Sequence, residues 1–135
     1  MKIRAVHFAL VLLCLAQGLT SCSDSSAPDE RASFVFRESL TGEVIHVDIT
    51  DQNALGEADR LRQSGEERWV VGTPVRGDGG FNAPWTWHLD PASISFAEVT
   101  IEACQTAASA IADDIDYWIG FGQVCIWGVV EARQP

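Results

Sequence analysis

A stretch of nine residues, APWTWHLDP at 83–91, combines two tryptophans, a histidine and an aspartate. His88 is the side chain within it that can act as an acid, a base or a metal ligand near neutral pH. Two carboxylates, Glu98 and Glu102, follow on the next predicted strand and could lie beside His88 across a hairpin. An imidazole grouped with carboxylates could hold a divalent ion or transfer protons, so these three residues form a candidate polar cluster.

The same stretch also has a structural interpretation. Strand alternation puts its two tryptophans and Leu89 on one face and Thr86 and His88 on the other. Two core tryptophans with a hydrogen-bonded or half-exposed histidine fit that pattern, and Asp90 then caps the following turn. Because no serine or cysteine nucleophile has a visible activating partner, we favour this interpretation and predict no catalytic residue, metal ligand or cofactor.

Alternating and helical patterns predict the elements around this stretch. A β-hairpin is expected over 33–37 and 43–49, followed by a helix with Thr50 as its N-cap and Gly65 as its left-handed stop. Further strands are predicted over 68–75, 85–89, 93–104 and 123–132, and a second helix over 106–118. The order β-β-α-β-β-β-α-β indicates an α+β domain with a largely antiparallel sheet and two packed helices.

A glycine-rich segment at 76–84 is predicted to be an exposed loop, and we take it as the candidate binding surface. Its candidate contact residues are Arg76, Asp78, Phe81 and Asn82. The loop begins with the Arg-Gly-Asp triplet, which matches an integrin tripeptide but arises often by chance. An arginine at an exposed loop tip could also be presented to a trypsin-like protease, as inhibitors do.

The N-terminus has the layout of a secretory signal. Lys2 and Arg4 precede an apolar run that is too short to span a bilayer and ends in Leu-Thr-Ser-Cys, which resembles a bacterial lipobox. The sequence therefore predicts a lipoprotein signal peptide at 1–21 and a lipidated Cys22, which would attach the chain to a membrane. Ser23, where an inner-membrane retention signal would have aspartate, favours the outer membrane of a bacterial cell envelope.

Cleavage before Cys22 would divide the chain into the signal peptide and two further parts. Residues 22–31 form the lipidated cysteine and a polar, flexible tether, and residues 32–135 form a single domain. Cys104 and Cys125 are the cysteines beyond the lipid site, and in an oxidising envelope they predict one disulfide that stabilises the fold by about 3 kcal/mol.

The chain is strongly acidic. Nine basic residues less Lys2 and Arg4 leave seven arginines against nineteen carboxylates, a formal charge of −12. This balance argues against nucleic acid as a partner and against attraction to anionic lipid headgroups. It favours a neutral, basic or cationic partner. Three clustered acids, Asp113, Asp114 and Asp116, lack the spacing of a calcium loop and are expected to form a solvated face.

The segment GFNAPWTWHLDPASISFAEVTIEAC, followed by DIDYWI and VCIWG, resembles the N-terminal domain family of a calmodulin-binding protein of social amoebae. The shared features are a Pro-Trp-x-aromatic-His-Leu-Asp-Pro core, a Glu-rich strand that ends in cysteine, and a late Cys-x-Trp. The resemblance covers about 33–131, and Ile126 stands where the family tends to have proline. It implies no activity or site residues. Calmodulin itself is not expected as a partner, because it takes basic amphipathic helices and neither predicted helix is basic.

Together these features predict a lipid-anchored, extracytoplasmic and non-enzymatic domain that binds a protein or another envelope component through loop 76–84. Three alternatives remain open. The domain could be a protease inhibitor that presents this loop, a metal-binding or hydrolytic protein with its site at His88, Glu98 and Glu102, or a purely structural lipoprotein.

Overall fold

The structure, a computed structural model, describes residues 30–135. The predicted signal peptide at 1–21, the lipidation site Cys22 and most of the tether at 22–31 lie outside the described residues. Within 30–135, no helix has both the length and the apolar character needed to cross a bilayer.

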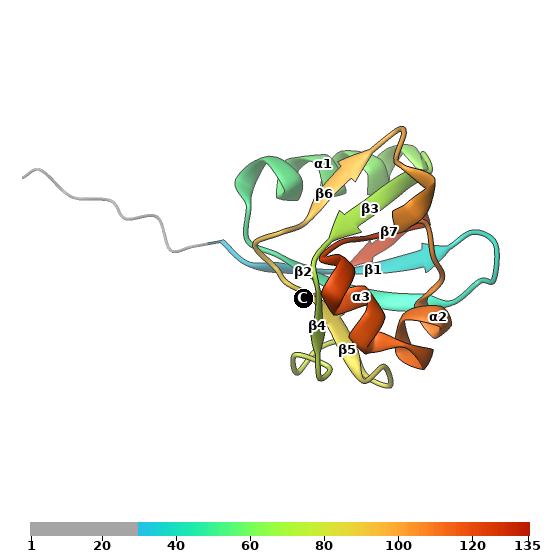
Figure 1. The fold of residues 1–135 in the computed structure, drawn as a ribbon. Helices are drawn as coiled ribbons and strands as arrows, with labels where there is room; N and C mark the ends of the chain where they lie inside the picture. Colours follow the sequence, from blue (N-terminus) through green and yellow to red (C-terminus); the bar gives the residue numbers. More distant parts are fainter. Residues whose placement is uncertain (1–29) are drawn as a thin grey trace, which may run out of the picture.

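A five-stranded antiparallel sheet forms the centre of the domain, with the strand order β2-β1-β7-β3-β6 (Figure 1). Its strands are β1 (Ala32–Glu38), β2 (Val44–Ile49), β3 (Arg68–Gly72), β6 (Ser95–Ala97) and β7 (Val124–Arg133). β7 pairs with β1 on one side and with β3 on the other. Gly128 is required in β7 because a Cβ atom there would collide with the carbonyl oxygen of Arg37. β7, the last strand of the chain, thus lies in the middle of the sheet between β1 and β3.

Three α-helices, a 3-10 turn and a second, two-stranded sheet complete the domain. They are α1 (Gln52–Ser64), β4 (Pro74–Arg76), β5 (Trp87–Leu89), η1 (Glu102–Cys104), α2 (Ala108–Asp113) and α3 (Ile115–Phe121). Figure 1 shows α1 at the top of the view and α2, α3, β4 and β5 at the bottom, with strands of the large sheet between them. The predicted α+β class and the largely antiparallel sheet are confirmed, with three helices in place of two.

One hydrophobic core joins these layers. The apolar face of α1 buries Ala54, Leu55, Ala58 and Leu61. The large sheet contributes residues such as Phe34, Phe36 and Ile126, while β5 and α2 contribute Trp87, Leu89 and Ile111. Every buried member of this core lies between Ala32 and Val130. A chain that begins at Ser23 therefore keeps the whole core and should fold without the lipid.

The first helix begins one residue later than predicted. Asp51, not Thr50, is its N-cap: the Asp51 Oδ1 atom accepts a hydrogen bond from the Ala54 amide at 2.9 Å. The Thr50 amide instead donates to the Pro91 carbonyl oxygen, which keeps that residue tied to the β5–β6 connection. The prediction for the other end is confirmed, because Gly65 closes the helix with a φ of 68°.

The prediction of one strand over 68–75 is wrong. β3 ends at Gly72 in the large sheet, and β4 begins at Pro74 in the small one. Between them, the Thr73 amide donates to Ser93 Oγ and the Thr73 carbonyl accepts from the Asp90 amide, both at 2.9 Å. These contacts with another segment turn the chain out of the first sheet.

The prediction of a long strand over 93–104 is also wrong. Only Ser95–Ala97 forms a strand, paired with Trp69 to Val71 of β3. Cys104 must then return to β7, where it forms the predicted disulfide with Cys125, and Gln105 makes a parallel bridge to the same cysteine. The connection 98–101 is left without a strand partner, and its apolar residues are exposed.

The second predicted helix, 106–118, forms as two short helices. The chain breaks at Asp114, whose φ of −141° is not helical and whose side chain caps α3 by accepting from the Tyr117 amide at 3.2 Å. The disulfide that precedes these helices has a Cα–Cα separation of 5.1 Å, and both of its cysteines are fully buried. It fixes the start of the α2–α3 segment against β7.

Candidate functional site

The predicted loop is confirmed, but it is fastened to the sheet. Asn82 is 1% exposed; its Oδ1 atom accepts from the His46 amide of β2, and its Nδ2 atom donates to the Trp87 carbonyl, both at 2.8 Å. The Trp85 indole donates to the Val44 carbonyl of the same strand at 2.7 Å. Because β2 is an edge strand, these contacts occupy backbone groups that would otherwise offer a pairing edge. Asn82 is therefore a structural residue and does not face a partner.

The other candidate residues of the loop are also held in place. Arg76 is the last residue of β4 and forms an ion pair with Asp116 of α3, so it does not lie at the loop tip as predicted. The Phe81 ring packs edge-on against His88, with ring centroids 5.3 Å apart. Asp78 is exposed, and its side chain accepts from the Gly80 amide at 2.9 Å. The exposed side chains of the loop are those of Arg76, Asp78, Ala83 and Pro84, and its other exposed residues are glycines.

The candidate polar cluster is not assembled. The predicted hairpin between the strands of His88 and Glu98 is wrong, because β5 pairs with β4 while β6 pairs with β3. The His88 Nδ1 atom lies 2.7 Å from the Gly77 carbonyl oxygen, Glu98 pairs with Arg68 at 3.1 Å, and Glu102 begins η1. Among residues 30–135, no group of histidine, cysteine and carboxylate side chains is arranged to hold a metal ion.

A different site appears on the exposed side of β3 and β7, where two tryptophans lie opposite each other. Trp69 and Trp127 are register partners, their ring centroids are 5.2 Å apart and their planes are tilted by 56°. Both are half-buried, whereas the next residues on the two strands, Val70 and Ile126, point into the core and are fully buried. Strand alternation in RWVV and CIWG could have shown that these tryptophans face away from the core.

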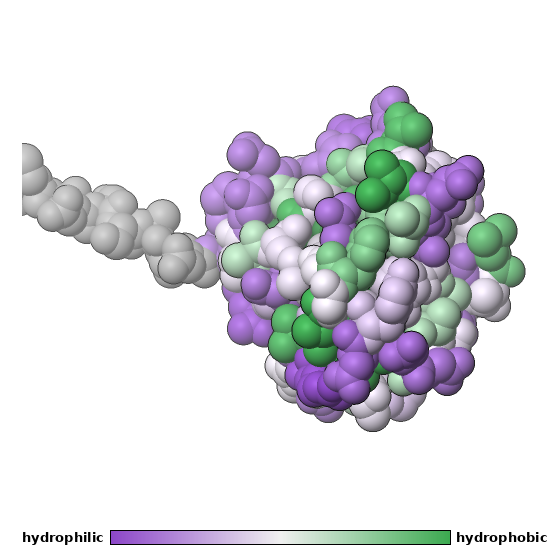
Figure 2. Space-filling model, viewed as in Figure 1, coloured by the Kyte–Doolittle hydropathy of each residue, from purple (hydrophilic) through white to green (hydrophobic). Residues whose placement is uncertain are grey.

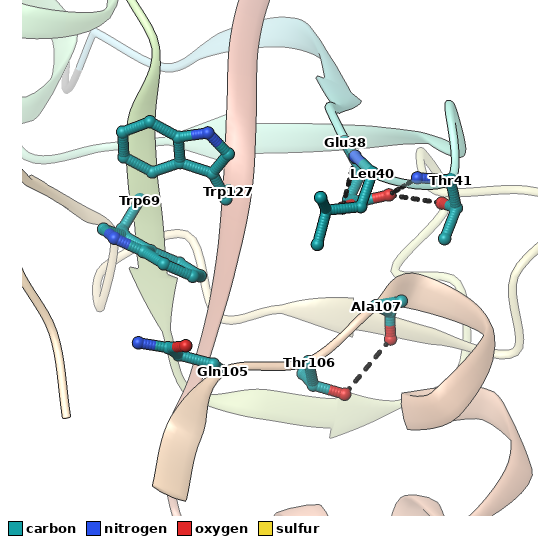
Figure 3. A pocket seen from close by; sticks show the side chains of 8 residues that line it. All are labelled: Glu38, Leu40, Thr41, Trp69, Gln105, Thr106, Ala107 and Trp127. Carbon is teal, nitrogen blue, oxygen red and sulfur yellow. Dashed lines mark hydrogen bonds between the residues drawn. The ribbon is translucent and has the colours of Figure 1, made fainter. Parts of the chain in front are cut away.

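The tryptophans form the wall of a groove between the β1–β2 turn and the segment after the disulfide (Figure 3). A depression of 210 Å³ is lined by Glu38, Leu40, Thr41, Trp69, Gln105, Thr106, Ala107 and Trp127. An adjoining depression of 370 Å³ shares four of these residues and adds Glu98. We call the two together the tryptophan groove. Its depressions are open and small, so they suit one protruding group at a time rather than an enclosed molecule.

Exposed aliphatic side chains occur in the segments that contribute to this groove. Leu40, in the β1–β2 turn, is 86% exposed, and Val99 and Ile101, between Glu98 and Gln105, are 83% and 63% exposed. Figure 2 shows apolar surface over the β1–β2 turn and over the connection after β6. Solvent-exposed aliphatic residues gathered around half-buried tryptophans are typical of a protein-binding surface.

A buried carboxylate forms one wall of the groove. Glu38 is 2% exposed and accepts hydrogen bonds from the Leu40 amide, the Thr41 amide and the Thr41 hydroxyl. Burial alone would raise the pKa of this carboxyl, but the three hydrogen bonds outweigh it, so the pKa lies below its ordinary value. Glu38 is therefore negatively charged at neutral pH, and no arginine among the described residues pairs with it.

A comparison with protein families identifies the domain. The model of the BP-74 N-terminal domain matches residues 30–133. The chain belongs to the BP-74 N-terminal domain family. No curated protein and no solved structure matches it.

The motif that carried the resemblance has a structural role in this BP-74 N-terminal domain. Within 84–91, Trp87 and Leu89 are core residues, and the Asp90 carbonyl and carboxylate accept hydrogen bonds from the turn that follows. At Ile126, where the resemblance expects proline, the chain continues the β3–β7 ladder opposite Val70. Trp127, the tryptophan of the late Cys-x-Trp, lies in the tryptophan groove, so the shared features contribute both to the fold and to the candidate site.

Proposed function

We propose that this member of the family is a non-enzymatic binding domain that holds a protein partner at the tryptophan groove. The observation that carries the proposal is the pairing of two half-buried tryptophans with three strongly exposed aliphatic residues, Leu40, Val99 and Ile101. Burying such side chains in an interface releases free energy, and tryptophan is enriched among the residues that dominate binding.

This proposal moves the contact surface away from loop 76–84. The loop residues with the largest side chains make intramolecular contacts: Asn82 with β2, Arg76 with α3 and Phe81 with His88. A partner that used them would have to break these contacts first. Neither the inhibitor alternative nor the metal-binding alternative gains support, because Arg76 lies within a strand and the polar cluster is dispersed.

The proposal places the domain in the bacterial cell envelope, attached to the outer membrane through lipidated Cys22. Its support is the lipobox-like Leu-Thr-Ser-Cys and the polar segment that follows, which would separate the domain from the lipid surface. After cell lysis, we expect the unchanged chain to sediment with the membrane fraction. The Cys22→Ser chain is expected to remain in the supernatant. A Ser23→Ala chain serves as the control for the local change in sequence. If the Cys22→Ser chain sedimented with membranes to the same extent as the unchanged chain, the lipid anchor at Cys22 would be excluded.

Affinity capture tests the binding surface. The chain from Ser23 onward is immobilised with its disulfide intact, and retained envelope proteins are identified. Leu40→Arg is the informative variant: the side chain is 86% exposed, so the fold tolerates the change, while a positive charge at the rim of the groove opposes apolar contact. We expect this variant to lose the partner that the unchanged domain retains.

Two control variants separate the groove from other surfaces. Arg76→Ala/Asp78→Ala alters the loop, and Tyr117→Arg places a matched charge on the exposed aromatic side of α3. Both are expected to retain the partner. Loss of the partner in the loop variant, with full retention by Leu40→Arg, would contradict the proposal and restore the loop as the binding surface.

A further inference from the structure

We propose that the tryptophan groove receives a cationic side chain, arginine or lysine, from a basic segment of the partner protein. This inference deepens the function proposed above and rests on it. Three features carry it: the free faces of the tryptophan pair, the uncompensated charge of Glu38 and the acidic surroundings of the groove.

The tryptophan pair offers an aromatic surface to a cation. Indole is the best aromatic partner for an ammonium or guanidinium group, and the gain grows when the contact is shielded from water. The two cation–aromatic contacts that the described residues make lie elsewhere, Arg31 over Phe81 and Arg133 over Phe34. A depression of 210 Å³ between the rings and Leu40 can hold one long side chain, whose methylene groups would pack on the leucine.

Glu38 adds a negative charge at the wall of the same depression. Its three hydrogen bonds come from neutral groups, so the hydrogen bonds fix the carboxylate without cancelling its charge. A carboxylate has about four acceptor positions, and one therefore remains after these three bonds. Because the Glu38 side chain itself is buried, its field at the groove is less screened than that of a surface carboxylate.

The rim of the groove is acidic as well. Glu98 lines the adjoining depression, and its one partner, Arg68, is shared with Glu66. Glu67 lies next to the β1–β2 turn, where it accepts a hydrogen bond from Ser39 at 2.5 Å. The three carboxylates of Glu38, Glu67 and Glu98 outnumber the guanidinium of Arg68, so a basic segment is attracted and an acidic one is repelled.

Nuclear magnetic resonance of the indole N–H groups tests this inference. The chain has five tryptophans, and three of their indoles are fixed by backbone carbonyls: Trp85 by Val44, Trp87 by Ala108 and Trp118 by Ala110. The probe is acetyl-arginine methylamide, and acetyl-citrulline methylamide is the control of the same shape without charge. We expect saturable shifts of the Trp69 and Trp127 signals with the arginine probe, small shifts of the other three, and about tenfold weaker binding of the citrulline probe.

Two variants locate the charge. Glu98→Gln changes an exposed side chain and is expected to weaken arginine binding severalfold without altering the spectrum elsewhere. Glu38→Gln is expected to weaken it further, and its spectrum reports directly whether the fold persists. Equal binding of the two probes, or no shift up to about 50 mM arginine probe, would overturn the cationic occupant. If Leu40→Arg still abolished capture in that case, the proposed function would stand with an apolar anchor. If the unchanged domain captured no partner, both proposals would fall.

Discussion

The Trp87→Ala variant is expected to lose about 3–5 kcal/mol of its free energy of unfolding, the largest effect of any single truncation in this domain. Trp87 is fully buried and is the largest side chain of the core. Its indole donates to the Ala108 carbonyl at 3.2 Å, so it also joins β5 to the first turn of α2. Truncation removes the apolar contacts, leaves a cavity and deprives a buried carbonyl of its donor.

Urea unfolding followed by fluorescence measures this loss. Trp118→Ala is the matched control, because Trp118 is half-buried and its indole likewise donates to a helical carbonyl, that of Ala110. We expect the control to lose less than about 2 kcal/mol. If the two variants were equally stable, Trp87 would not be the centre of the core.

Removing the disulfide is expected to lower the free energy of unfolding by about 3 kcal/mol, because the cross-link closes a loop in the unfolded chain. The two cysteines are separated by 21 residues, and both are fully buried. The Cys104→Ala/Cys125→Ala variant therefore loses the cross-link and leaves two small cavities. The measurement compares the urea concentration at the unfolding midpoint for the oxidised chain, the reduced chain and this variant. Equal midpoints would contradict the predicted stabilisation by the disulfide.

Removing the disulfide should also affect the tryptophan groove. Gln105, Thr106 and Ala107 line one wall and directly follow Cys104, and the Thr106 amide donates to the Cys125 carbonyl at 3.1 Å. Without the disulfide this segment keeps one bridge to β7. We expect removal of the disulfide to accelerate amide hydrogen exchange at 105–107 more than in α1.

The sequence predicts the parts of the fold that depend on local pattern. The β1–β2 hairpin follows from alternation, Gly65 ends α1 because its φ of 68° favours glycine, and the disulfide follows from two remaining cysteines. Helix and strand breaks depend on contacts between distant segments. The chain turns at Thr73 because Ser93 and Asp90 bind its backbone, and the chain leaves β3 after Ala97 and reaches Cys125 through Cys104.

The fold places the candidate residues differently from the expectation for a related reason. The glycines of loop 76–84 indicate a loop but do not show that Asn82 is buried against β2. The cluster of His88, Glu98 and Glu102 assumed that neighbouring strands in sequence pair with each other, whereas β5 and β6 belong to different sheets. Trp69 and Trp127 are separated by 58 positions in the chain, and only the β3–β7 register brings their rings together.

Site-specific photo-crosslinking in living cells tests the central claim most directly. A benzoylphenylalanine residue is placed at Leu40, beside the tryptophan groove, or at Asp78, in the exposed part of the loop. Both positions face solvent, so the two chains differ in the surface that they report. The account predicts a covalent adduct with one partner protein from position 40 and none from position 78. An adduct from position 78 alone would contradict the account and return the binding surface to the loop.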